Sequence, residues 1–229
     1  MPPADHPGPM VFVTDLEAPA LAEDDRHHLE RVLRLRPGDP LVLGDGHGGW
    51  RPARLGAEPE ATGPIVVEEP AHPSLTIGFA LVKGHKPELA VQKLTELGID
   101  RIVLFRAERS VVRWDDGQAA RALARLRSVA RAAALQSHRT WLPLVEGVVT
   151  LGDISAEPEA AMADRGGDPP SLAHTTVLVG PEGGWSPAER SLLVPRMALG
   201  PHVLRAETAA LTAGALMTAL RSGLLGPTT

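Results

Sequence analysis

Hydrophobic positions follow two different patterns along the chain, and the change between them falls near residue 75. Before this point, short apolar runs alternate with turns rich in glycine, proline and aspartate, which is typical of small β-structures. A short helix is expected over residues 27–35, where Leu29, Val32 and Leu33 are spaced for one helix face. The β-segments are expected over residues 10–14, 41–44, 49–55 and 65–69. The first part of the chain is therefore expected to be a small β-barrel.

After residue 75 the pattern alternates between strands and helices, as in an α/β layer domain. An apolar strand over residues 75–82 is followed by a helix in which Ala90, Leu94 and Leu97 share one face. Gly98 occupies the usual C-terminal stop of that helix. The remaining elements are expected as strands over residues 102–105 and 176–179, a long helix over 117–138 and an apolar helix over 210–224.

Two segments lack apolar periodicity. Residues 68–74 contain two prolines, which resist regular structure, and are interpreted as a linker. Residues 152–174 are rich in alanine, aspartate, glycine and proline, and are expected to form a loose surface loop. The chain is therefore expected to contain two domains, residues 1–72 and residues 73–229.

The net charge of −5 conceals an uneven distribution along the chain. Residues 80–141 hold 12 Lys and Arg against 6 Asp and Glu, whereas both flanking regions are acidic. Arginine dominates this basic block, and its planar guanidinium suits phosphate recognition. The pattern fits either an RNA-binding surface or an ordinary solvated helix face. The arginines of the long helix that share its polar side are Arg121, Arg125, Arg127, Arg131 and Arg139.

The composition excludes several kinds of chemistry. The chain contains no cysteine, so it has neither disulfides nor thiolate nucleophiles, and its histidines lack paired metal-ligand spacing. We therefore expect no metal site. No apolar run reaches the ~18 residues of a membrane span, and the N-terminus lacks the features of a signal peptide, so a cytoplasmic protein is expected. Its chemistry must depend on oxygen and nitrogen groups and on a bound cofactor.

The first local motif covers residues 176–189 and combines a strand, a glycine-rich turn and a helix start. Ser186 and Glu189 have the spacing of a helix capping box. An ordinary tight turn is the alternative interpretation, and the Lys-Ser/Thr ending of a phosphate-binding loop is missing. Three glycines allow positive φ angles and close approach of the main chain to a ligand: Gly180, Gly183 and Gly184.

The second motif covers residues 199–209 and leads into the apolar helix. Glu207 and Thr208 suit a helix N-terminus, where a carboxylate meets the positive end of the dipole and a hydroxyl can cap. Arg205 stands among apolar neighbours. It is either a solvated charge or a guanidinium held at the edge of a ligand.

These two segments resemble the second and third motifs of the SPOUT methyltransferases, and specifically the RsmE family of 16S rRNA uracil-N3 methyltransferases. Further matches cover residues 28–34, 37–39, 83–84, 92–98, 109–110 and 136–139. The resemblance implies a PUA-like RNA-binding β-barrel over residues 1–72 and a SPOUT α/β domain with a trefoil knot over residues 73–229. Such a knot breaks the usual rule against threaded chains and cannot be inferred from periodicity.

The resemblance further implies that S-adenosyl-L-methionine binds at the two motifs, mainly through backbone groups. The residues expected to hold the cofactor are Leu178, Val179, Gly180, Pro181, Glu182, Gly183, Gly184, Leu199, Gly200, Leu204, Arg205, Ala206, Thr208 and Ala209. A homodimer is also implied, with the apolar helix as a surface to bury.

The implied reaction is methylation of uracil N3 at one uridine of 16S rRNA in the small ribosomal subunit, at the position usually numbered 1498. Neutral N3 carries a proton and is a poor nucleophile, so the deprotonated base must be favoured. Arg205 is predicted to stabilise negative charge on the uracil, while Glu207 or Glu182 orients it or relays the proton. The residues predicted to contact RNA are Arg31, Arg34, Lys83, Lys93, Arg109, Arg131, Gln136 and Arg139.

Two alternatives remain open at this point. One is a SPOUT methyltransferase that modifies another nucleotide or a ribose 2′-hydroxyl. The other is a non-catalytic RNA-binding assembly factor that has lost the cofactor. The intact glycines of the first motif and Arg205 argue against the second alternative, and a titration with S-adenosyl-L-methionine separates it from the enzymes.

Overall fold

The computed structural model describes residues 3–82, 86–110, 112 and 114–226. The chain divides into two compact units. The first contains Met1–Pro70 and Arg131–Leu142, and the second contains Ala71–Ala130 and Pro143–Thr229. The return of residues 131–142 to the first unit was not predicted from the sequence, because helical periodicity does not show which unit the end of a long helix joins. The domain boundary between residues 72 and 73 stays a prediction.

The first unit is built on a five-stranded sheet in the order β1-β2-β3-β4, with β5 also paired to β3. All four predicted β-segments contain strands, and the short β4 was missed. The core of this sheet is formed by apolar residues such as Val11, Leu41 and Leu43, which are almost completely buried. The strands are β1 (Met10–Phe12), β2 (Pro40–Gly44), β3 (Gly49–Arg54), β4 (Glu60–Ala61) and β5 (Val66–Val67).

The predicted helix of the first unit begins earlier than expected. It consists of α1 (Glu23–His27), followed by a π-helical turn, η2 (His28–Val32). Its first turn is acidic, which the positive end of a helix favours, so the start was misplaced by relying on apolar spacing alone. Arg34 has a φ of 58°, which a continuing helix does not allow. A short 3-10 turn, η1 (Pro3–Asp5), precedes β1.

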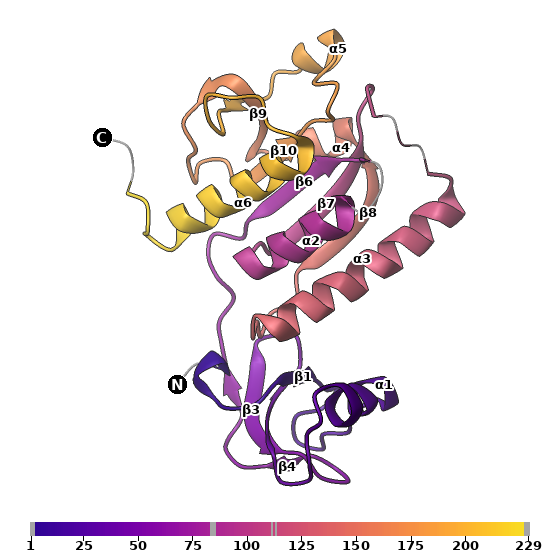
Figure 1. Ribbon diagram of the computed structural model, residues 1–229. Coiled ribbons are helices and arrows are strands. Elements are labelled where there is room, and N and C mark those ends of the chain that lie inside the picture. Colours follow the sequence, from indigo (N-terminus) through magenta and orange to yellow (C-terminus); the bar gives the residue numbers. More distant parts are fainter. Residues whose placement is uncertain (1–2, 83–85, 111, 113, 227–229) are drawn as a thin grey trace. The chain divides into compact units, whose positions relative to one another are not determined.

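The second unit is an α/β domain with a six-stranded sheet in the order β11-β9-β10-β6-β7-β8, and every neighbouring pair is parallel (Figure 1). Parallel neighbours require crossover connections, and a helix lies in the connection from β6 to β7 and in the one from β7 to β8. The strands are β6 (Thr76–Ala80), β7 (Arg101–Arg106), β8 (Leu144–Thr150), β9 (Ala160–Asp168), β10 (Thr176–Val179) and β11 (Arg196–Met197). The helices are α2 (Lys86–Leu97), α3 (Asp116–Gln136), α4 (Leu151–Ser155), α5 (Pro187–Arg190) and α6 (Ala206–Arg221). The predicted α/β class is confirmed, and the trefoil knot stays a prediction.

The expectation of a loose loop over residues 152–174 was wrong. This segment contains α4 and the nine-residue strand β9, which lies between β10 and β11. The start of β9, Ala160 to Met162, is fully buried and pairs with β10. Alanine, aspartate and glycine have low strand propensity, so the pairing with two neighbouring strands determines this element rather than its composition.

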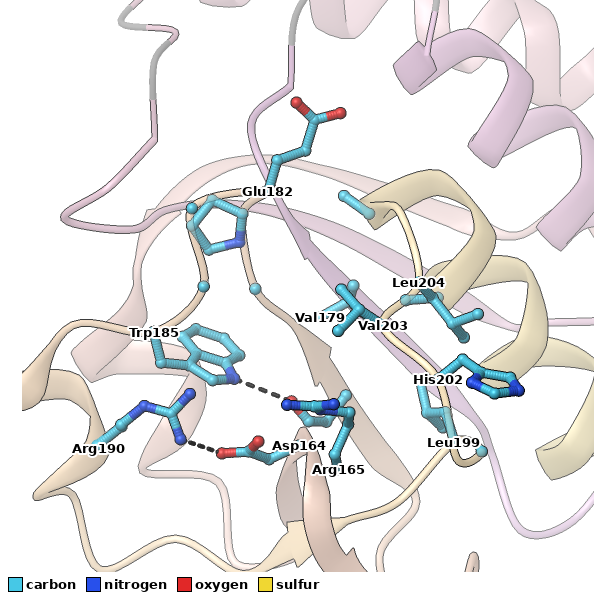
Figure 2. A pocket seen from close by; sticks show the side chains of 18 residues that line it. Asp164, Arg165, Val179, Glu182, Trp185, Arg190, Leu199, His202, Val203 and Leu204 are labelled. Carbon is cyan, nitrogen blue, oxygen red and sulfur yellow. Dashed lines mark hydrogen bonds and ion pairs between the residues drawn. The ribbon is translucent and has the colours of Figure 1, made fainter.

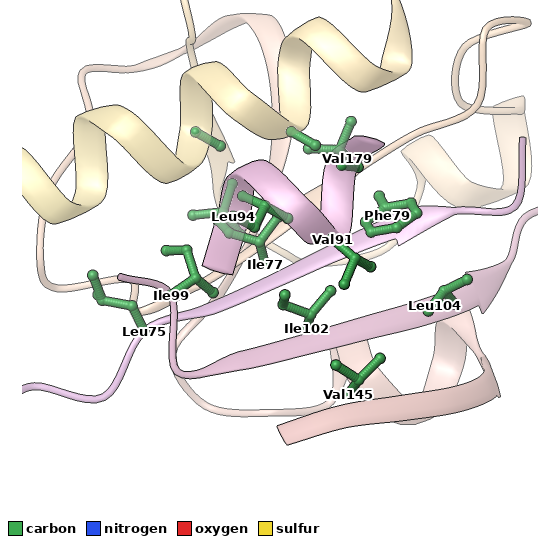
Figure 3. Packing of buried hydrophobic residues seen from close by; sticks show 14 of the residues in the cluster. Leu75, Ile77, Phe79, Val91, Leu94, Ile99, Ile102, Leu104, Val145 and Val179 are labelled. Carbon is green, nitrogen blue, oxygen red and sulfur yellow. The ribbon is translucent and has the colours of Figure 1, made fainter. Parts of the chain in front are cut away.

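The main core lies between the sheet and the helices α2 and α6 (Figure 3). Ile77, Phe79 and Leu94 are almost completely buried there. A Cβ added at Gly214 would lie 2.6 Å from the side chain of Leu94, so a glycine is needed where α6 crosses α2. α6 begins at Ala206, four residues before the predicted start, and its N-cap position is Arg205 rather than Thr208. The close packing of α6 against α2 determines where the N-terminus of α6 lies in the second unit.

Candidate active site

A pocket of about 330 Å³ lies in the second unit, beyond the carboxyl end of β10 (Figure 2). Its walls come from both sequence motifs and from β9, which the sequence did not predict. Ligands of open α/β sheets bind at the carboxyl ends of the strands. The predicted cofactor residues that line this pocket are Val179, Gly180, Pro181, Glu182, Gly183, Gly184, Leu199, Gly200, Leu204, Ala206 and Ala209.

Three predicted cofactor residues do not line the pocket. Leu178 is fully buried in β10 and packs in the core of the sheet. Arg205 and Thr208 are exposed. The carbonyl of Arg205 accepts a hydrogen bond from the backbone N–H of Ala209 at 2.8 Å, whereas its guanidinium makes no hydrogen bond or ion pair with any residue that the structure describes. The two motifs therefore meet around one cavity, while the guanidinium of Arg205 is left accessible next to it.

The glycines of the first motif differ in what requires them. Gly184 has a φ of +68°, and Gly200 of the second motif has a φ of +147°, so both adopt the left-handed region that favours glycine. Gly180 instead lies close to the indole of Trp185, where an added Cβ would come within 2.8 Å of a ring atom. Neither Gly180 nor Gly183 uses the positive φ that glycine allows, so a positive-φ turn at Gly183 is a wrong expectation, and an added Cβ there would meet Arg109 at 3.4 Å.

The predicted capping box is present at the start of α5. The backbone N–H of Glu189 donates to Ser186 Oγ at 3.2 Å, and the backbone N–H of Ser186 donates to Glu189 Oε2 at 2.7 Å. The other carboxylate oxygen of Glu189 accepts a hydrogen bond from the backbone N–H of Glu108 at 2.8 Å. One buried carboxylate thus joins the glycine-rich turn to the segment that follows β7.

Trp185 and Arg109 hold the turn from two other directions. Trp185 Nε1 donates to the carbonyl of Ala163 at 2.9 Å, and its ring stacks on Phe105 with the centroids 6.0 Å apart. Arg109 Nη1 donates to the carbonyls of Gly183 and Trp185 at 3.1 and 3.4 Å. The predicted RNA contact Arg109 therefore packs against the main chain of the turn.

A cluster of charges lies beside the pocket at the N-termini of α2 and α6. Lys86 forms an ion pair with Glu182 of the glycine-rich turn and lies 3.5 Å from Glu207 Oε2 in the first turn of α6. The hydrogen bond to Glu182 raises the pKa of Lys86, and the same hydrogen bond, followed by the charge of Lys86, lowers the pKa of Glu182. Glu207 Oε2 is buried and accepts no hydrogen bond within the described part of the chain.

Comparisons with known proteins agree with this geometry. A family model described as an RNA methyltransferase domain matches residues 68–218, and one described as an RNA methyltransferase PUA domain matches residues 21–61. A protein of Mycobacterium bovis named ribosomal RNA small subunit methyltransferase E is 35% identical over 216 residues, which cover 83% of this chain and 82% of that protein. The chain belongs to the ribosomal RNA small subunit methyltransferase E family. The family that the two motifs resemble is thereby confirmed, as is the PUA-like character of the N-terminal part.

Two further members of the methyltransferase E family also align with nearly the whole chain. The Bacillus subtilis protein of the same name is 30% identical over 227 residues, which cover 86% of this chain and 89% of that protein. The crystal structure of ribosomal RNA small subunit methyltransferase E from Neisseria gonorrhoeae, bound to S-adenosyl methionine, superposes with a TM-score of 0.77 at 26% identity. It covers 93% of this chain and 97% of that structure.

Several residues that line the pocket were missed from the sequence. Asp164 and Arg165 belong to β9, a segment that was predicted to be a loop from its amino-acid composition. Asp164 forms an ion pair with Arg190, and both side chains face the pocket in Figure 2. His202 also lines the pocket, although no histidine was given a role. A glycine-rich turn after a strand indicates a ligand site, but it does not show which neighbouring strand completes it.

The predicted RNA contacts that the structure describes are divided between the two units. In the first unit, Arg31 and Arg34 are exposed, whereas Arg131 forms an ion pair with Asp25 at 2.8 Å. Gln136 and Arg139 belong to the same unit, Lys93 of the second unit pairs with Glu96 at 2.8 Å, and Lys83 lies outside the described residues.

The described residues were expected to contain neither a metal site nor a membrane-spanning helix. Within them, no group of three or more histidine, aspartate or glutamate side chains is placed to hold a metal ion. None of the helices found there has the length and apolar character needed to cross a membrane.

Proposed function

We propose that this protein transfers a methyl group from S-adenosyl-L-methionine to N3 of one uridine in the 16S rRNA of the small ribosomal subunit, near its 3′ end. The observation that carries the proposal is a pocket whose walls both motifs help to form, with an accessible arginine directly beside it. Membership of the methyltransferase E family supports the rRNA substrate.

The pocket fits the proposed cofactor. Its volume of about 330 Å³ falls within the ~300–1,000 Å³ of small-molecule sites. Val179, Leu199 and Leu204 provide apolar surface for an adenine ring, and the turns expose backbone hydrogen-bonding groups. A Cβ at Gly184 or Gly200 would meet no atom within 4 Å, so at these glycines the main chain borders open space that a ligand can approach closely. The lining contains two carboxylates, Asp164 and Glu182, and two guanidiniums, Arg165 and Arg190, of which Arg190 pairs with Asp164.

When bound, the cofactor supplies an electrophilic methyl group. The protein must then present N3 of the uracil in line with it and accept the N3 proton. Glu207 is the carboxylate that we assign to proton acceptance, because it lies two residues after Arg205 in the first turn of α6, with its buried Oε2 3.5 Å from the ammonium of Lys86. Loss of the proton leaves negative charge on the uracil oxygens.

Arg205 is the group that we assign to this charge. Its guanidinium is exposed, has no partner among the described residues and follows Leu204, which lines the pocket. A charged donor that is already in place stabilises developing charge without further reorganisation. Arg205 and Glu207 therefore form the proposed catalytic pair, with Arg205 as electrostatic stabiliser and Glu207 as proton acceptor.

The RNA is proposed to bind by shape and phosphate contacts. Uracil N3 is a pairing edge, so the target uridine must be unpaired or flipped out. The chain contains no tyrosine, 3 phenylalanines and 4 tryptophans, and this low aromatic content argues against a stacking platform. Arg31 and Arg34 of the PUA-like unit are exposed and suit phosphate contacts. The site of action is the cytoplasm, where the small subunit is assembled.

We further propose that the protein acts as a homodimer. The buried face of α6 is used by its own core, but Leu224 and Leu225 beyond it are exposed apolar residues that a partner copy can cover. Light scattering should give twice the chain mass of 24.2 kDa. A fully active monomer would contradict this proposal.

Mass mapping of 16S rRNA tests the function. Cells that lack the protein should lose N3-methyluridine at one position, and the wild-type gene should restore it while an Arg205→Ala gene should not. A change in a different nucleoside would support modification of another RNA position instead. An unchanged set of modified nucleosides, together with no binding of S-adenosyl-L-methionine in calorimetry, would support a non-catalytic assembly factor.

A further inference from the structure

Lys86 is a residue that neither motif contains, yet it contacts both. It is the first residue of α2, and its ammonium lies between the carboxylates of Glu182 and Glu207. Glu182 belongs to the turn after β10, and Glu207 belongs to the first turn of α6. One cation therefore links the two segments that border the pocket.

The cluster contains a second cation, Arg205, whose guanidinium forms no ion pair with a described residue. The Glu182 carboxylate feels the charge of Arg205, yet its ion pair is with Lys86. Side chains of Glu182 and Lys86 are 53% and 32% exposed, so both retain the freedom to change partners. Without Lys86, Arg205 remains as a cation whose charge the Glu182 carboxylate already feels.

We propose that Lys86 is a positioning residue that holds the carboxylate of Glu182 and thereby keeps the guanidinium of Arg205 free for the uracil of the RNA substrate. This inference rests on the proposed function, since it assigns a task to the surroundings of Arg205. It also explains why Glu182, which lines the pocket, does not pair with the arginine of the second motif. Lys86 itself contacts neither the methyl donor nor the base in this scheme.

Substitution of Lys86 tests the idea by single-turnover methylation of purified small subunits. Lys86→Met should lower the rate about 10-fold, since Arg205 is diverted and a misplaced group is costly in catalysis. Affinity for S-adenosyl-L-methionine, measured by calorimetry, should stay within about threefold because the apolar and backbone contacts remain. Lys86→Arg retains the cation and should stay within about threefold of the wild-type rate.

A second substitution distinguishes positioning from simple bracing. The double variant Lys86→Met with Glu182→Gln should be faster than Lys86→Met alone, because the amide no longer attracts Arg205. If Lys86 only braces the fold, removing Glu182 as well should not restore any rate. Arg125→Met is the matched control, since it removes an ion pair between α3 and Glu88 of α2 away from the pocket. The melting temperature and methylation rate of Arg125→Met show the effect of losing an ion pair that lies away from the pocket.

A readout that does not need methylation separates this inference from the proposed function. The side-chain Nε–H resonance of Arg205, assigned from its loss in Arg205→Lys, should exchange more slowly with water in Lys86→Met than in the wild type. If the wild type methylates no rRNA but this exchange slows, the function is wrong and the positioning role stands. Unchanged exchange in Lys86→Met, or a double variant no faster than Lys86→Met, would overturn the role of Lys86.

Discussion

The two walls of the pocket are built in different ways. The glycine-rich turn is held by the capping box of Ser186 and Glu189, by the indole of Trp185 and by the side chain of Arg109. The opposite wall, residues 199–204, makes no hydrogen bond within the part of the chain that the structure describes, and Val203 is 77% exposed. Segments with few buried contacts open at low free-energy cost. One wall is therefore preformed, whereas the other can adapt to its ligands.

Substitutions in the two walls should therefore have different effects. A change in the preformed wall should lower both the stability of the fold and the affinity for the cofactor, because the same contacts serve both. A change in the adaptable wall, or in Arg205 directly after it, should alter function with little effect on stability. Four experiments, in order of decreasing expected effect, test this contrast.

Arg205→Ala should give the largest effect. Turnover should fall by roughly 100-fold, the scale for removing one charge-stabilising donor, while the melting temperature stays near the wild-type value because Arg205 has no partner among the described residues. Arg205→Lys should recover only part of the rate, since a point charge lacks the planar fork. Single-turnover rate, cofactor affinity and melting temperature are measured on the same sample. A large fall in melting temperature would assign Arg205 to the fold instead.

Gly180→Ala should disrupt the preformed wall. The new Cβ would lie 2.8 Å from the Trp185 ring, which is buried and stacked on Phe105 and so has little room to move. Overpacking of this kind costs about 1–3 kcal/mol, and the displaced turn should also bind the cofactor more weakly. Chemical denaturation and calorimetry measure the two effects. Gly166→Ala is the control, since its Cβ would meet nothing within 4 Å. Equal stability of the two variants would refute the prediction.

Glu189→Ala should destabilise the same wall by a smaller amount. It removes one half of the capping box and leaves the backbone N–H of Glu108 without its acceptor. The expected loss is about 1–2 kcal/mol of unfolding free energy, with weaker cofactor binding. Glu189→Gln keeps one acceptor and should lose less. If denaturation shows a loss but cofactor affinity is unchanged, the coupling between stability and binding in this wall is wrong.

The smallest effect concerns the pH dependence of the Lys86–Glu182 pair, which joins α2 to the glycine-rich turn. Because Lys86 lowers the pKa of Glu182 below its usual 4.5, the pair stabilises the fold above that value, and this contribution is lost as the pH falls through the lowered pKa. Both groups are exposed, so the change in stability should be small. Carboxyl NMR titration of the wild type and Lys86→Met should show the Glu182 pKa rising in the variant. Identical titration curves would contradict the ion pair.

The prediction of strands and helices succeeded where a local signal was strong. The strand at Thr76–Ala80, the helix ended by Gly98 and the capping box at Ser186 all follow from side-chain spacing and backbone preferences that act over a few residues. The same local signals identified the two motifs, and with them most of the pocket lining.

What the sequence by itself determined is therefore the α/β class, the two motifs and the family that they indicate. Only the tertiary structure decided that β9 is a strand and brings Asp164 to the pocket, that Gly184 rather than Gly183 has a positive φ, and that Lys86 pairs with Glu182. The physical reason is the range of the interactions. Strand pairing and ion pairs between distant residues depend on neighbours in space, such as Lys86 and Glu182, whose separation along the chain carries no periodic signal.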